Sequence, residues 1–138
     1  AAIGLAQFKK IDLLNKKREN ILKKYLKGIK DCKYISPTYP YKLKNSSYWL
    51  FSVNCEFRDD LITFLKKKNI STAVHFVPLP LNYLYKKYKK GKLENAYKNW
   101  QKIVSLPFFP DLESKNINYI IKCLKTFDKK LISKYEAI

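Results

Sequence analysis

The only histidine of the chain, His75, is the side chain with the widest chemical range. It lies in the stretch Asn69–Leu81, which reads N-I-S-T-A-V-H-F-V-P-L-P-L. Val74 and Phe76 predict a short, largely buried strand, and the two prolines that follow end it. We expect His75 where this strand ends, a position from which side chains often leave the core for a cleft. A lone histidine is more often structural than functional, so both interpretations stay open at this point.

No complete catalytic constellation accompanies the histidine. The three cysteines Cys32, Cys55 and Cys123 are widely spaced, which is typical of idle thiols in a reducing cytoplasm and gives no metal site. Asp59 and Asp60 open a predicted helix, where carboxylates favour the helix dipole, so capping explains them first. With only three glycines, the sequence has no glycine-rich phosphate loop. The residues alone therefore predict a domain without a complete active site.

The charge balance is strongly basic, with a formal net charge of +18. Nearly all of the basic residues are lysines; only Arg18 and Arg58 are arginines. Specific phosphate and base recognition favours arginine, whereas lysines spread along every predicted helix indicate solvated faces. We therefore expect no specific nucleic-acid partner and keep non-specific polyanion binding as an alternative. No apolar run approaches the roughly 20 residues of a membrane span, so we expect a cytoplasmic protein without membrane contact.

The elements that must position His75 follow from the hydrophobic pattern. An aromatic strand at Tyr48–Val53, with apolar residues on both faces, precedes an amphipathic helix at Arg58–Lys68. The strand before His75 follows, and Ile103–Leu106 is the third strand. These segments predict the α+β class, with a small antiparallel three-stranded sheet packed by helices on one face. The length of 138 residues predicts one domain spanning 1–138.

Helical segments fill most of the remaining chain. Ala1–Lys30 is predicted as one long helix whose uncapped, apolar start indicates missing upstream sequence. A connector, Asp31–Ser47, follows it. Ser114–Tyr135 is the last helix, capped by Ser114 or Asp111. Between the second and third strands, we expect a short helix at Glu94–Gln101 and, in Asn82–Lys92, tyrosines that cover a core edge.

Three motifs in order carry a family resemblance. They are A-A-I-G-L-A-Q-F at the start, R-D-D-L-I-T-F-L before N-I-S-T-A-V-H-F-V-P-L, and S-L-P-F-F-P-D-L near the end. Together they resemble the carboxy-terminal third of the DegT/DnrJ/EryC1/StrS family of sugar aminotransferases, from Ala1 to about Leu124. The resemblance implies the small domain of the type I aspartate-aminotransferase fold. It also implies an enzyme that uses pyridoxal phosphate to move an amino group from glutamate to a nucleotide-linked keto sugar.

The resemblance further implies which functions this chain lacks. The Schiff-base lysine and the groups that hold the cofactor belong to an upstream large domain that is absent here. We therefore expect no catalytic and no cofactor-binding residue in this chain, no pyridoxal phosphate bound by the chain alone, and no activity. The complete enzyme is expected to form a homodimer through the large domain.

His75 and Phe76 match the family's His-Tyr or His-Phe pair, which makes them the expected substrate-binding residues. Pro80, Trp49 and Tyr97 depart from the family pattern and put the sugar specificity in doubt. A degenerate, non-catalytic interaction domain therefore remains an alternative.

Overall fold

The computed structural model describes residues 1–38, 47–88, 90–91 and 93–136. Five α-helices, three strands and two 3₁₀ helices lie in these residues. In chain order they are α1 (Ala2–Phe8), α2 (Ile11–Ile29), β1 (Ser36–Pro37), β2 (Phe51–Asn54), α3 (Arg58–Lys66), η1 (Leu79–Leu81), η2 (Tyr83–Tyr88), α4 (Glu94–Lys102), β3 (Ile103–Leu106) and α5 (Ser114–Tyr135).

The sheet is antiparallel, in the order β1-β2-β3. Its register places Ser52 opposite Ser105 and Val53 opposite Val104. Phe51, Ser52 and Val53 of β2 are buried, whereas Trp49, within the predicted strand Tyr48–Val53 but outside β2, is 66% exposed. The α+β class with a three-stranded antiparallel sheet is therefore confirmed.

One of the three predicted strands is wrong. The stretch around Val74 is not a strand of the sheet, because only Ala73 pairs, through an isolated bridge to Ser105, and β1 takes the third place. The prolines at 78 and 80 lack backbone donors, so a ladder cannot continue along this segment. Val74 is half-buried and Phe76 is 70% exposed, so the predicted burial of this stretch is also wrong. The His75–Phe76 peptide bond is cis.

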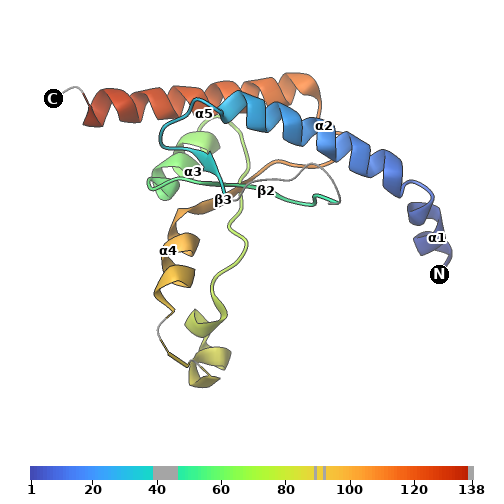
Figure 1. Cartoon of the computed structure of the whole chain (residues 1–138), viewed down its shortest axis with the longest axis horizontal. Coiled ribbons are helices and arrows are strands. Elements are labelled where there is room, and N and C mark those ends of the chain that lie inside the picture. The colour runs from blue at the N-terminus through green and yellow to red at the C-terminus, as the bar shows by residue number, and fades with distance from the viewer. Residues whose placement is uncertain (39–46, 89, 92, 137–138) are drawn as a thin grey trace.

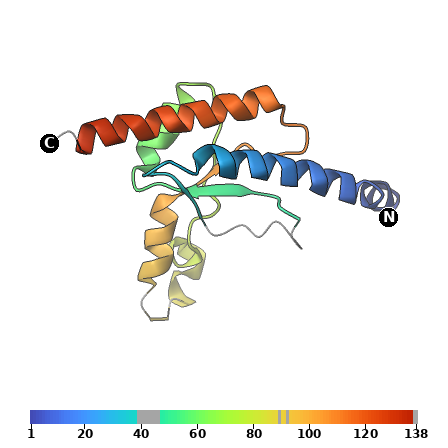
Figure 2. The same cartoon turned by 45° about the horizontal axis from the view of Figure 1, so that its top comes forward.

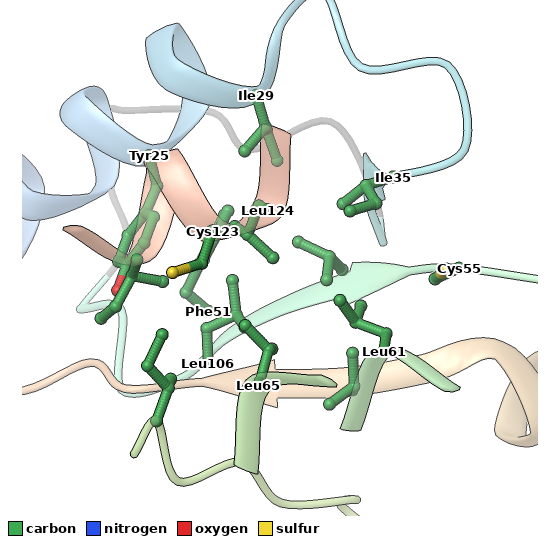
Figure 3. Close-up of a cluster of buried hydrophobic side chains, with 14 of the residues drawn as sticks. Tyr25, Ile29, Ile35, Phe51, Cys55, Leu61, Leu65, Leu106, Cys123 and Leu124 are labelled. Atoms are coloured by element: carbon green, nitrogen blue, oxygen red, sulfur yellow. The ribbon is translucent and has the colours of Figure 1, made fainter. Parts of the chain in front are cut away.

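Helices α2 and α5 lie side by side over the sheet, and α3 packs beside them (Figures 1 and 2). Tyr25 of α2 stacks on Phe51 of β2 with ring centroids 4.8 Å apart, and its hydroxyl donates to the carbonyl of Pro107 at 2.9 Å. Figure 3 shows side chains from all three helices converging on the strands. The labelled members of this core are Tyr25, Ile29, Ile35, Phe51, Cys55, Leu61, Leu65, Leu106, Cys123 and Leu124.

A buried carboxylate fixes the connection between α2 and the sheet. Asp128 of α5 is 3% exposed and accepts hydrogen bonds from the backbone N–H groups of Lys33 (3.1 Å) and Tyr34 (2.7 Å). Two backbone donors compensate the cost of burying this charge. Asp128 thereby holds the chain that leads from α2 into β1.

Two predictions about the helices need correction. The predicted single helix is two, because Lys10 N–H bonds the carbonyl of Gln7 and interrupts the i→i−4 ladder between α1 and α2. Helix α5 has the predicted bounds, but its N-cap position is Glu113 and no side chain caps it. Ser114 and Asp111 instead accept hydrogen bonds from lysines of α2.

The segment from η1 to α4 projects from the body as an arm (Figure 1). Tyr83 and Tyr88 of this arm are 88% and 66% exposed, so the prediction that these tyrosines cover a core edge is wrong. Within the described part of the chain, no helix is long and apolar enough to span a membrane.

Candidate functional site

The candidate site begins with two serines in the middle of the sheet. Ser52 of β2 and Ser105 of β3 face each other in the register, and their Oγ atoms are 2.9 Å apart. They are 8% and 4% exposed and are flanked by apolar residues in both strands. A hydroxyl buried in such a strand needs a hydrogen-bond partner, and here each serine supplies one to the other.

Ser105 also anchors the segment that carries the histidine. Its backbone N–H donates to the carbonyl of Ala73 at 2.7 Å, and its carbonyl accepts from the N–H of Ala73 at 3.2 Å. Two residues later, Nδ1 of His75 lies 3.0 Å from the Ser105 Oγ. One strand residue therefore holds both the backbone and the side chain of this segment.

Exposed aromatic rings flank the half-buried imidazole. The Trp49 indole is 66% exposed, and its centroid is 6.4 Å from that of His75 at an interplanar angle of 55°. Phe76 is 70% exposed and makes an edge contact with the imidazole at 5.0 Å and 77°. This arrangement offers one hydrogen-bonding nitrogen and two apolar ring surfaces to a ligand.

A groove of about 360 Å³ adjoins this cluster through Trp49. Its other walls come from α1, the first half of α2 and Ser47. Phe8 and Ile11 make the groove largely apolar, and Arg18 supplies a positive charge beside Asn15, whose Oδ1 accepts from the arginine at 3.4 Å.

The described residues include no buried, unpaired lysine. A Schiff-base lysine has to be desolvated to act as a nucleophile. The described lysines are exposed, except Lys102, which is half-buried and paired with Glu56. The buried carboxylate of Asp128 is already bound to backbone donors. Among the described residues, no group of His, Cys, Asp and Glu can hold a metal ion.

The cysteines are free thiols outside the cluster. Cys55 and Cys123 are buried and Cys32 is half-buried. Burial, the largest cause, raises the pKa of Cys32 and of Cys55 to about 11. These two thiols are therefore poor nucleophiles at neutral pH, in line with the prediction of idle thiols.

Of the predicted substrate-binding residues, His75 and Phe76 lie together at the surface beside Trp49. The sequence analysis did not find Ser52 and Ser105. A single serine within an otherwise apolar strand, as in Y-W-L-F-S-V and I-V-S-L, is the signal that could have found them.

Solved structures with the same fold include sugar aminotransferases. DesV from S. venezuelae superposes with a TM-score of 0.85 at 25% identity over 92% of this chain and 35% of that one. Helicobacter pylori PseC, an aminotransferase involved in the biosynthesis of pseudoaminic acid, superposes with a TM-score of 0.84 at 25% identity over 94% of this chain and 36% of that one. The sheet and helices described above are therefore those of a small domain of such enzymes.

Sequence relatives agree with the structural likeness. An uncharacterized protein of Methanocaldococcus jannaschii is 33% identical over 134 residues, which cover 91% of this chain and 35% of the relative. The spore coat polysaccharide biosynthesis protein SpsC of Bacillus subtilis is 27% identical over 94% of this chain and 36% of its own length. The chain thus spans about a third of the curated relatives that it matches. The sequence model of one family matches residues 1–125, and the chain belongs to that family, the DegT/DnrJ/EryC1/StrS aminotransferases.

Proposed function

We propose that the chain is the carboxy-terminal small domain of a nucleotide-sugar aminotransferase and that His75 and Phe76 lie on its substrate side. The observation that carries the proposal is the set of contacts around the His75 imidazole. One of its nitrogens is held by Ser105, and exposed aromatic rings flank it, in a chain that belongs to a family of aminotransferases. A buried structural histidine would have no such surroundings.

In this function the imidazole binds the sugar nucleotide. Its second nitrogen forms a hydrogen bond with a sugar hydroxyl or a phosphate oxygen, and Phe76 and Trp49 pack on a ring of the substrate. Pyridoxal phosphate, where the complete enzyme holds it, supplies the electron sink for amino transfer. Glutamate, as amino donor, acts at that centre, outside the described residues.

The exposed apolar residues of α1 support a contact with a further domain. Ile3, Leu5 and Phe8 are 81%, 65% and 71% exposed, and α1 has no buried residue. Apolar groups gathered on one short helix are typical of a covered surface. We propose that a cofactor-binding large domain covers these residues. The complete enzyme forms a cytoplasmic homodimer through that domain.

A chimeric enzyme tests the proposal. The chain replaces the matched carboxy-terminal region of a family enzyme of measured activity, and amino transfer from glutamate to a nucleotide keto sugar is followed. We expect the chimera to bind pyridoxal phosphate and turn over. His75→Ala should raise the KM for the sugar and leave the cofactor absorbance and the KM for glutamate unchanged. A folded, cofactor-loaded chimera without amino transfer would overturn the proposal.

The chain alone should be inactive, because its described lysines do not provide the desolvated amine that a Schiff base requires. The measurement is conversion of a keto sugar by the purified chain with added pyridoxal phosphate and glutamate. Sustained conversion above the level of a boiled control would contradict this prediction.

One observation favours a non-catalytic interaction domain as the second candidate. The exposed apolar residues of α1 and of the arm, such as Tyr83 and Leu84, suit a protein partner regardless of activity. A chimera that folds and dimerises but transfers no amino group is the outcome that this second function predicts.

A further inference from the structure

We propose that Ser105 and Ser52 are positioning residues that hold His75 in one tautomer, with Nε2–H directed to the exposed side of the ring. This inference rests on the proposed function, in which His75 binds the sugar. The arrangement itself consists of three side chains from β2, β3 and the segment after Ala73.

The geometry is a chain of two short contacts. The Oγ atoms of Ser52 and Ser105 are 2.9 Å apart, and the Ser105 Oγ lies 3.0 Å from Nδ1 of His75. Both distances are those of good hydrogen bonds. The serines are fixed by the strand register and the histidine by the backbone bridge between Ala73 and Ser105, so the three groups meet without a flexible side chain among them.

Either atom could donate at each of the two contacts, and the proposal assigns the direction in which Nδ1 accepts. A neutral imidazole carries one N–H, and the nitrogen without a proton is a better acceptor than an alcohol oxygen. In the proposed arrangement the Ser105 hydroxyl donates to Nδ1, and the Ser52 hydroxyl donates to Ser105. Hydrogen bonds that run in one direction strengthen one another in a buried setting. The remaining proton is then on Nε2, and at the surface this N–H is a donor for an anionic or hydroxyl oxygen.

The burial of the serines supports a role beyond sheet packing. Each is less than 10% exposed in a strand whose neighbours are apolar, where valine or alanine would pack without a polar cost. The second nitrogen of His75 has no hydrogen-bond partner among the described residues. The buried hydroxyls therefore lead to one free donor position on an imidazole that contacts Trp49 and Phe76.

Nitrogen NMR on the chain tests this arrangement directly, because the single histidine gives the only imidazole signals. With the ring in its neutral form, we expect the ¹⁵N shift of an unprotonated nitrogen at Nδ1 and that of a protonated nitrogen at Nε2. A protonated Nδ1, or two averaged shifts from exchanging tautomers, would overturn the proposal.

Substitutions separate positioning from packing. Ser105→Ala should move the two ¹⁵N shifts toward each other, Ser52→Ala should move them the same way by less, and Ser105→Thr should restore the wild-type values because it keeps the hydroxyl. Ser71→Ala, at an exposed serine, is the matched control and should change nothing. A folded Ser105→Ala chain with wild-type shifts would contradict the proposal. If that variant does not fold, the wild-type spectrum and Ser52→Ala decide in the same way.

Kinetics in the chimera distinguish this inference from the proposed function. Ser105→Ala should raise the KM for the sugar nucleotide about three- to tenfold, the effect of one hydrogen bond, and leave the KM for glutamate unchanged. If the tautomer is fixed as expected but neither Ser105→Ala nor His75→Ala changes the sugar KM, the hydrogen-bond chain stands and the sugar-binding role fails.

Discussion

At the scale of single residues, the candidate site combines a buried anchor with exposed contact groups. Ser105 is buried and fixed by the sheet, whereas Phe76 and Trp49 are mostly exposed. His75 lies between them and uses one nitrogen for each environment. Because the ring fills little of the core, its contribution to folding should be small, in contrast to that of Asp128.

His75→Ala should lower the free energy of unfolding by about 1 kcal/mol or less, since it removes one hydrogen bond and leaves Ser105 bound to Ser52. Asp128→Ala, which strands the N–H groups of Lys33 and Tyr34, should cost about 2–3 kcal/mol. Urea unfolding followed by circular dichroism measures both. A loss for His75→Ala as large as that for Asp128→Ala would identify His75 as a core residue.

The raised pKa values of Cys32 and Cys55, about 11 each, predict slow alkylation. Only the thiolate reacts, so its fraction at pH 8 should be roughly two orders of magnitude below that of an ordinary cysteine. As the pH rises, the thiols of the unfolded chain lose their protons first, whereas the same thiols in the folded chain stay protonated. The contribution of these two thiols to the free energy of unfolding is therefore fully present below about pH 8.5 and is lost as the pH rises toward 11. Iodoacetamide labelling of native and urea-unfolded chain, read by mass spectrometry, tests the reactivity, and equal rates would contradict it.

At the scale of elements, the crossing of α2 and α5 depends on a glycine. A Cβ built on Gly28 would lie 2.6–2.9 Å from three side-chain atoms of Ile121, closer than van der Waals contact allows. Glycine usually weakens a helix, and at this position it permits the two helices to approach.

Gly28→Ala should therefore destabilise the chain by about 1–2 kcal/mol, because the overlap with Ile121 outweighs the gain in helix propensity of about 1 kcal/mol. Adding Ile121→Ala removes the opposing atoms, so the double variant should be more stable than the sum of the two single changes predicts. Gly4→Ala in α1 is the control, since no atom lies within 4 Å of its Cβ position and no loss is expected. Additive single changes would exclude the clash.

The elements also show what the sequence could predict. Helix α5 has the predicted bounds because its apolar positions recur over many turns. The strand at Val74 was wrong because a short apolar run does not reveal whether a neighbouring strand can pair with it. β1, of two residues, is too short to carry a pattern. The pair His75–Phe76 was found through the resemblance, whereas Ser105 depends on cross-strand register, which no local pattern encodes.

At the scale of the whole molecule, two surface properties oppose each other. The net charge of +18 repels copies of the chain from one another at low salt. The apolar face of α1, formed by Leu5 and Phe8, and the adjoining Trp49 favour association when no other domain covers them. Salt screens the repulsion and leaves the hydrophobic contact in place. The salt dependence of association therefore reports which property dominates.

We expect the isolated chain to self-associate through the α1 face, and to do so more strongly as salt is raised from about 50 to 500 mM, because the Debye length falls below about 5 Å over this range. Sedimentation velocity measures the change. Phe8→Lys should keep the chain monomeric, whereas Phe109→Lys, at a residue that is 50% exposed and outside this face, should not. Polyanion binding has the opposite dependence, since affinity for nucleic acid falls with salt. The prediction would be contradicted by a chain that remains monomeric at all salt concentrations and whose affinity for nucleic acid falls steeply with salt. That result would identify the basic surface, and not α1, as the binding surface.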